Sequence, residues 1–182
     1  MNKYKLERNN TALIIIDLQE RLMAAMQDRE EVYKNTRILL DTAKQFNIPV
    51  VVSEQYPRGL GQTVDVIKEK LGEYHYLEKV DFSLCNERGM QLLQGLNKKT
   101  FIVTGSETHV CVFQTVRDLL AAGYNVHLAK DAVCSRFDDN YQNALDLMRD
   151  MGAVISNTET IVFDLLQAAG TPEFKAISPL IK

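Results

Sequence analysis

The 182-residue sequence has no tryptophan, four prolines and only three cysteines, and these scarcities narrow what the chain can be. Cys85, Cys111 and Cys134 are an odd number without the short spacings of a zinc site, so neither a disulfide framework nor a metal site is favoured. At least one thiol is therefore expected to be free. No linker, low-complexity tract or internal repeat interrupts the sequence.

Long hydrophobic runs and an excess of positive charge are missing too. No stretch approaches the roughly 20 apolar residues that cross a bilayer, and residues 1–8 lack an apolar core of signal-peptide length. The net charge is −3, and lysines and arginines are scattered without forming a basic stripe. We therefore expect a cytoplasmic protein that has neither a membrane nor a nucleic acid as its partner.

What the sequence does contain is an alternation of short apolar runs with longer stretches of helical periodicity. This alternation is typical of a parallel sheet covered by helices. The runs predict strands at 11–17, 48–53, 75–80, 99–104, 125–129 and 153–156, and helices at 29–46, 87–94, 109–122, 138–151 and 158–168. We expect one α/β domain over residues 1–182, a three-layer α/β/α sandwich around a mainly parallel six-stranded sheet, Rossmann-like with order 3-2-1-4-5-6.

Two segments lie outside this alternation. Residues 55–63 contain Pro57, Gly59 and Gly61 and predict a loop on the rim of the sheet. The tail after Pro172 is mixed apolar and basic, and we expect it to pack on the body of the protein or on a neighbouring subunit.

Three chemically capable side chains lie where predicted strands end. Asp17 closes the aliphatic run 11–16, Lys79 lies near the end of the third strand, and Cys111 follows the fourth strand after the turn at Gly105. The carboxyl ends of parallel strands form one rim, where ligands bind. Cys111 would fall in the first turn of a helix, where free N–H groups and the helix dipole favour a thiolate and can hold an oxyanion. The three residues predict a cysteine nucleophile with its own base and charge partner.

Each of these residues also has an ordinary structural interpretation. Asp17 could cap the following helix, because Asp is a good N-cap residue. Lys79 lies in a strand of which either face could be exposed to solvent. Cys111 could be a structural residue, because a cysteine that is buried behaves as a small hydrophobic residue. Cys85 and Cys134 do not follow a Gly-ended strand, so we expect them to be structural.

The three histidines are weaker candidates for the base. His109 is two residues from Cys111, which places it on another face of a helix. His127 lies in the middle of a strand and His75 at the start of one. A Cys–His hydrolase is therefore possible but disfavoured.

Three sequence segments carry a family resemblance: residues 14–19, residues 79–83 and residues 103–112. In this order and spacing they resemble the isochorismatase-like cysteine hydrolases, which include nicotinamidases and N-carbamoylsarcosine amidohydrolases. The resemblance extends over nearly the whole chain. Within that superfamily, residues 53–61 and 172–175 look most like the isochorismatase domain-containing proteins.

The resemblance implies a role for each residue of the motifs. Asp17 would accept the thiol proton, Lys79 would stabilise the charge, and Cys111 would attack a carbonyl carbon to give a thioester. It also implies a cis peptide bond between Ser106 and Glu107, which would aim the backbone N–H groups of Glu107 and Cys111 at the oxyanion.

Two departures from related families bear on the substrate. Nicotinamidases carry an Asp-x-His group after the second strand that helps to bind a metal, whereas residues 54–56 here are Glu-Gln-Tyr. We therefore expect no metal and no cofactor, and nicotinamide is disfavoured as the substrate. True isochorismatases cleave a vinyl ether without needing a cysteine, so the presence of Cys111 favours acyl chemistry.

The sequence thus predicts a cysteine hydrolase acting on a small amide-like substrate at a C–N bond, and a homo-oligomer. The expected lining of the substrate pocket is Gln19, Gln55, Tyr56, Phe82, Thr108 and Phe113. One alternative is a non-catalytic binding or scaffold protein that retains the fold. A phosphoacceptor receiver domain is another, but it needs paired acids near the first strand, and Leu18 and Gln19 follow Asp17.

Overall fold

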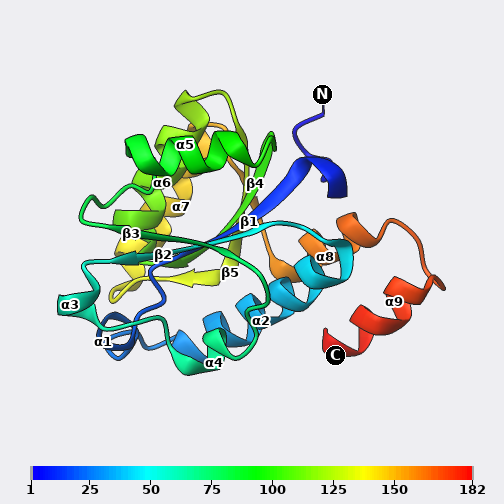
Figure 1. Cartoon of the computed structure of the whole chain (residues 1–182), viewed down its shortest axis with the longest axis horizontal. Coiled ribbons are helices and arrows are strands. Elements are labelled where there is room, and N and C mark those ends of the chain that lie inside the picture. The colour runs from blue at the N-terminus through cyan, green and yellow to red at the C-terminus, as the bar shows by residue number, and fades with distance from the viewer. Residues whose placement is uncertain (1, 182) are drawn as a thin grey trace.

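A computed structural model describes residues 2–181, and a parallel sheet runs through the centre of the molecule (Figure 1). The strands are β1 (Thr11–Ile16), β2 (Val50–Gln55), β3 (His75–Lys79), β4 (Thr100–Ser106), β5 (Asn125–Cys134) and β6 (Val154–Ser156). They form one six-stranded sheet in the order β3-β2-β1-β4-β5-β6, and every neighbouring pair is parallel. The predicted fold class and strand order are confirmed.

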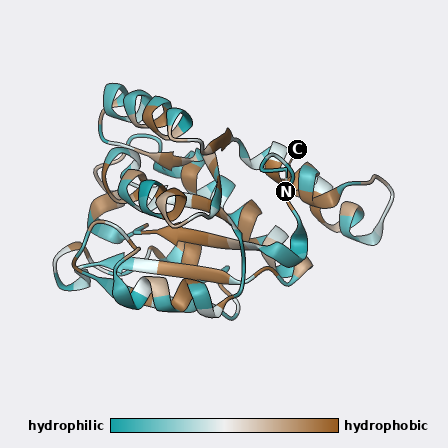
Figure 2. Cartoon of the chain, turned by 90° about the horizontal axis from the view of Figure 1, so that it is seen from above, coloured by the Kyte–Doolittle hydropathy of each residue, from teal (hydrophilic) through white to brown (hydrophobic). Residues whose placement is uncertain are grey.

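Strand β1 lies at the centre because all of its residues are aliphatic or small and all are buried. Neighbouring side chains of a strand point to opposite faces. Leu13 and Ile15 therefore join a core cluster on one face, whereas Ile14 and Ile16 join a second cluster on the other. Figure 2 shows the hydrophobic strands enclosed between helices whose outer surfaces are hydrophilic.

The helices divide between these two faces. Helices α2 (Arg29–Phe46) and α8 (Thr158–Leu166) contribute buried residues to the cluster of Leu13 and Ile15. On the other face lie α5 (Glu87–Gly95), α6 (Phe113–Ala121) and α7 (Asp138–Asp150). The apolar face of each helix thus covers one side of the sheet, as the periodicity predicts.

Strand β5 is the element whose predicted extent was wrong. It was expected to end at residue 129 but continues to Cys134. The exposed Lys130 and half-buried Asp131 interrupt the apolar pattern, whereas Ala132, Val133 and Cys134 are buried again. The β4–β5 register shifts between the pairs Val103–Leu128 and Gly105–Val133, so the extra residues lie in β5, and the strand resumes its pairing beyond this interruption.

Short helices also form where none was predicted. Helix α1 (Glu20–Met23) follows β1, α4 (Asp65–Lys68) follows the predicted loop, and α3 (Pro57–Leu60) lies inside it. The predicted helix 109–122 divides into a π-helical turn over Thr108–Val112 and then α6.

The tail packs on the body of the protein. It forms α9 (Pro172–Ile177) and a 3₁₀ turn at Ser178–Leu180, near α8 and α2 (Figure 1). Ile177 is buried, and Phe174 and Ile181 pack against the core cluster of the α2 face. Across residues 2–181, no helix is both long and apolar enough to cross a bilayer.

Gly105 permits a close backbone approach just before the segment that carries Cys111. It has φ +134°, and a Cβ atom there would lie 2.1 Å from the carbonyl oxygen of Ile16. Only glycine can occupy this position without displacing β4 from β1. The close pairing holds the carboxyl end of β4 beside Asp17.

Candidate active site

Asp17 lies immediately after β1, in the left-handed region with φ +51°, and is fully buried. Its Oδ2 accepts a hydrogen bond of 2.6 Å from Lys79 Nζ, and its Oδ1 accepts one of 2.7 Å from Ser53 Oγ. The three residues come from the carboxyl ends of β1, β2 and β3, which are adjacent in the sheet. Asp17 does not cap α1, because the N-cap residue there is Gln19 and no side chain caps the helix.

Lys79 points to the buried side of edge strand β3, together with Leu77. Besides Asp17, its ammonium group donates to the carbonyl oxygens of Asp81 at 3.3 Å and Phe82 at 3.0 Å. Three acceptors match the three protons of an ammonium group. The side chains of Lys79 and Asp17 are both 0% exposed, so each charge depends on the other for compensation.

Cys111 is buried, and both charges of this ion pair act on its thiol. Burial raises the pKa of Cys111, and the charge of Asp17 and a hydrogen bond to its carboxylate act in the same direction, whereas Lys79 opposes them. The direction is opposite to the one predicted from the position of Cys111 at the start of a helix, because burial penalises the charged thiolate. The thiol is therefore protonated near neutral pH and lies beside a carboxylate that can accept its proton.

The segment leading to Cys111 has the backbone geometry that the resemblance implied. The peptide bond between Ser106 and Glu107 is cis. The Ser106 hydroxyl donates to the backbone carbonyl oxygen of Asp17 at 3.1 Å, which ties the end of β4 to the end of β1. The carbonyl oxygen of Glu107 accepts hydrogen bonds from the N–H groups of Val110 and Val112, the two neighbours of Cys111.

Gln19 and Gln55 are joined to each other rather than pointing freely into a pocket. The Gln19 amide nitrogen donates to the carbonyl oxygens of Gln55 at 3.0 Å and Gly61 at 2.7 Å, and its oxygen accepts from the Gln55 N–H at 2.8 Å. Gln19 is fully buried and so fastens the end of β2 to the loop after α3. The Gln55 side chain donates weakly to the Val80 carbonyl oxygen, at 3.4 Å.

The other four expected pocket residues differ in exposure. Tyr56 and Phe82 are exposed, and Phe113 is half-buried against the core. Thr108 is fully buried, and its hydroxyl oxygen has no hydrogen-bond partner among the described residues. A buried polar atom without a partner is unusual and costs free energy, so a ligand that bonds to Thr108 would remove that cost.

The histidines lie apart from the Asp17–Lys79 pair. The Nδ1 atom of His109 faces Ser135 Oγ at 3.0 Å. His127 is buried and its Nε2 contacts the Lys3 carbonyl oxygen at 2.8 Å, while burial lowers the pKa of its imidazole. His75 is exposed at the amino end of β3, the end opposite to Lys79.

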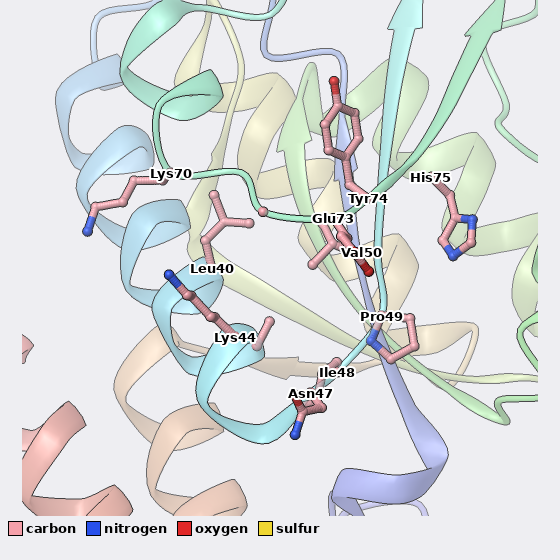
Figure 3. A pocket seen from close by; sticks show the side chains of 12 residues that line it. Leu40, Lys44, Asn47, Ile48, Pro49, Val50, Lys70, Glu73, Tyr74 and His75 are labelled. Atoms are coloured by element: carbon pink, nitrogen blue, oxygen red, sulfur yellow. The ribbon is translucent and has the colours of Figure 1, made fainter.

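Two cavities lie near the sheet. One of about 530 Å³ opens at the amino ends of β2 and β3 beside the end of α2, away from Cys111, and Figure 3 shows its lining. The other, of about 500 Å³, is bordered by residues 80–83 and by Gln114 on α6, so it adjoins the loop that binds Lys79. Within residues 2–181, no group of three His, Cys, Asp or Glu side chains is placed to hold a metal ion.

Sequence reasoning missed three residues that support this site. Ser53 and Ser106 hydrogen-bond to Asp17, and Arg136 bonds to the Glu107 carboxylate. The position of Ser53 near the end of β2 could have indicated its role, since neighbouring parallel strands end at the same rim. Arg136 gives no comparable signal.

Comparison with known proteins agrees with this fold. The isochorismatase domain model matches residues 11–160. The chain belongs to the isochorismatase family. It is 36% identical over 180 residues to isochorismatase family protein 1A of Dictyostelium discoideum, covering 96% of this chain and 87% of that one.

Two other proteins similar to this chain are described as having different functions from each other. A secreted isochorismatase effector of Phytophthora sojae is 38% identical over 179 residues, covering 96% of this chain and 85% of that one. A solved structure described as the MAR1 ribonuclease of Caenorhabditis elegans superposes with a TM-score of 0.92 at 36% identity, covering 97% of this chain and 92% of that one. The family is therefore shared by proteins with different descriptions, and membership alone does not name a substrate.

Proposed function

We propose that this protein is a cysteine-dependent hydrolase of a small amide-like substrate and that it acts through a thioester on Cys111. The observation that supports this most directly is the fully buried Asp17–Lys79 ion pair, whose two charges both act on the buried Cys111 thiol. A nucleophile bonded to a base that is itself held by a third group is the general arrangement of covalent catalysis.

In the first step, Asp17 accepts the thiol proton as sulfur attacks the carbonyl carbon of the substrate. A base beside the thiol is required because the raised pKa of Cys111 leaves little thiolate at rest. Negative charge then moves to the carbonyl oxygen, where the N–H groups of Glu107 and Cys111 stabilise it. Collapse of this intermediate breaks the C–N bond, and the leaving nitrogen takes the proton from Asp17.

In the second step, water hydrolyses the thioester. Asp17, again a carboxylate, accepts a proton from the attacking water and returns it to the Cys111 sulfur as the acid product leaves. Lys79 stabilises Asp17 whenever that residue is a carboxylate, before it takes the thiol proton and again after it has passed the proton on. The Lys79 ammonium group donates to three acceptors, so these hydrogen bonds hold it in one position during both steps.

The substrate would be small. Tyr56 and Phe82 are exposed aromatic side chains on the segments next to Lys79, and they offer flat apolar surfaces to a ligand. The Thr108 hydroxyl has no hydrogen-bond partner among the described residues, so it would be free to form one hydrogen bond with the substrate. Gln19 and Gln55 would act by fixing the loop that carries Tyr56, and Phe113 would form part of the apolar wall.

Two other functions are less well supported. A binding or scaffold protein would have no need to bury a charged pair against a thiol, since burying charges is costly. An RNA substrate is disfavoured by the net charge of −3, although the nematode relative is described as a ribonuclease.

Competitive labelling with iodoacetamide followed by peptide mapping tests the activated thiol. The two comparison thiols are in the same chain: Cys85 is more exposed than Cys111, and burial raises the pKa of Cys85 and of Cys134 to about 12. Exposure alone predicts that Cys85 reacts first, whereas an adjacent base predicts that Cys111 does. Labelling of Cys111 no faster than Cys85 would refute the proposal.

Trapping an acyl group tests the chemistry itself. The protein is incubated with a set of small primary amides and quenched in acid, and the mass increase is mapped to a peptide. We expect an acyl adduct on Cys111 that is absent in Cys111→Ala and retained in Cys85→Ala. An adduct distributed equally between the two cysteines would contradict a thioester mechanism.

We also propose that the protein forms a homo-oligomer. Val80, Phe82 and Tyr56 are exposed apolar or aromatic residues on neighbouring segments, and Val80 is 77% exposed. Such exposed clusters are typical of interfaces. Light scattering should therefore give a mass that is a multiple of the 20.7 kDa chain, and a monomer at micromolar concentration would refute this part.

A further inference from the structure

The turn over residues 106–112 carries Cys111 and the two N–H groups proposed for the oxyanion, so its exact position would decide the rate. A small displacement of a catalytic group can lower a rate many-fold. The turn must therefore be fixed by residues outside it, and the segment that follows β5 lies against it.

The first contact is between Glu107 and Arg136. The Arg136 backbone N–H donates to Glu107 Oε2 at 3.0 Å, and its guanidinium Nε contacts Oε2 at 3.0 Å and Oε1 at 3.2 Å. The Glu107 side chain is 8% exposed, so its charge has little access to water and depends on this partner. One residue thus holds both oxygens of the carboxylate, through its main chain and its side chain.

Two neighbouring contacts hold the same turn. Ser106 pairs with Cys134 in the β4–β5 ladder, and the Ser135 hydroxyl contacts His109 Nδ1 at 3.0 Å. Three consecutive residues, 134 to 136, therefore bind the turn at three points. The segment that follows β5 acts as a clamp on the turn.

The charge of Glu107 also reaches the nucleophile. It is among the causes that raise the pKa of Cys111, after burial and Asp17. A positive partner on Glu107 reduces this effect, because opposite charges placed together largely cancel at a distance. Arg136 therefore has an electrostatic consequence for Cys111 as well as a geometric one.

We propose that Arg136 is a positioning residue for the turn that carries Cys111: it holds the Glu107 carboxylate and fixes the turn against the end of β5. The inference rests on the proposed function, because the position of the turn affects a rate only if Cys111 is the nucleophile. It assigns a role to a half-exposed arginine that lies outside the Asp17–Lys79–Cys111 group.

The test is the pH dependence of Cys111 alkylation by iodoacetamide in Arg136→Gln. We expect the rate near neutral pH to fall about tenfold and the midpoint of the pH profile to move to higher pH, because the Glu107 charge, which raises the pKa of Cys111, would no longer be balanced. Arg136→Lys should show a smaller loss of rate, because lysine keeps the positive charge but lacks the planar guanidinium group. The double variant Glu107→Gln/Arg136→Gln should return the midpoint toward that of the unaltered protein.

Arg149→Gln is the matched control. Arg149 also pairs with an acid, Asp146, and its side chain is 55% exposed, close to the 51% of Arg136, but it lies in the last turn of α7, whereas the contact of this helix with His109 comes from Asn140 in its first turn. Its substitution should change neither the rate nor the midpoint. Thermal unfolding and the labelling rate of Cys85 verify that each variant is folded.

The outcomes separate the two proposals. If Cys111 of the unaltered protein labels no faster than Cys85, the proposed function fails. If it labels faster, and Arg136→Gln leaves the rate within about twofold and the midpoint within about 0.3 pH unit of the original values, only the positioning role fails. Should Arg136→Gln not fold, an unchanged rate in Arg136→Lys overturns the inference in the same way.

Discussion

Replacing Lys79 with methionine should destabilise the fold far more than replacing a lysine in a partly exposed ion pair. Methionine fills most of the volume of lysine but leaves the buried Asp17 carboxylate without its cation. Removing one partner of a fully buried pair costs about 3–5 kcal/mol, because the remaining charge is uncompensated. The side chains of Lys79 and Asp17 are both 0% exposed, so the cost of a fully buried pair applies to them.

Part of the cost will be offset by contacts that remain. Asp17 Oδ1 keeps its 2.7 Å hydrogen bond from Ser53, whereas Oδ2 loses a donor at 2.6 Å. The carbonyl oxygens of Asp81 and Phe82 lose their donor as well. We therefore expect a loss in the free energy of unfolding of at least about 3 kcal/mol.

Urea unfolding of Lys79→Met and Lys70→Met measures the difference. Lys70 pairs with Asp41 at 2.9 Å, but those side chains are 33% and 26% exposed, so its substitution should cost less than about 1 kcal/mol. The double variant Asp17→Asn/Lys79→Met should lose less stability than the sum of its single variants, since it removes both charges together. Equal losses in Lys79→Met and Lys70→Met would refute the assignment of a buried, mutually dependent pair.

Two further predictions concern the free energy of unfolding: one for the backbone at Gly105 and one for the buried imidazole of His127. Gly105→Ala should lower the free energy of unfolding by more than about 2 kcal/mol, since its Cβ would meet the Ile16 carbonyl oxygen at 2.1 Å. Gly95→Ala, where nothing lies within 4 Å, should be neutral or slightly stabilising, and equal losses at both positions would contradict the close approach. Burial lowers the pKa of His127 in the folded protein, so the unfolded chain binds a proton more readily. The stability that the neutral imidazole contributes is fully present above pH 6.5 and is lost as the pH falls below 6.5. The loss is at most about 1.4 kcal/mol per pH unit. His127→Gln should flatten this pH dependence, and an unchanged slope in urea midpoints would show that other groups cause it.

The elements that sequence predicted well are those with a strong local pattern. The aliphatic run of β1 and the helical periodicity of α2 repeat over many neighbouring residues, so each element could be located without knowing the rest of the chain. Strand β5 was underestimated because Lys130 and Asp131 break the alternation locally, and only pairing with β4 shows that the strand continues.

The sequence by itself determined the layered α/β architecture and the presence of an acid, a lysine and a cysteine at the ends of parallel strands. It could do so because strand ends share one rim whatever the details of packing. The tertiary structure alone decided that Lys79 is fully buried against Asp17 and that Arg136 holds Glu107, residues 62 and 29 positions apart in the chain. It also decided the direction of the Cys111 pKa shift. These properties depend on register, burial and the distances between side chains from different elements, and no local pattern in the chain encodes them.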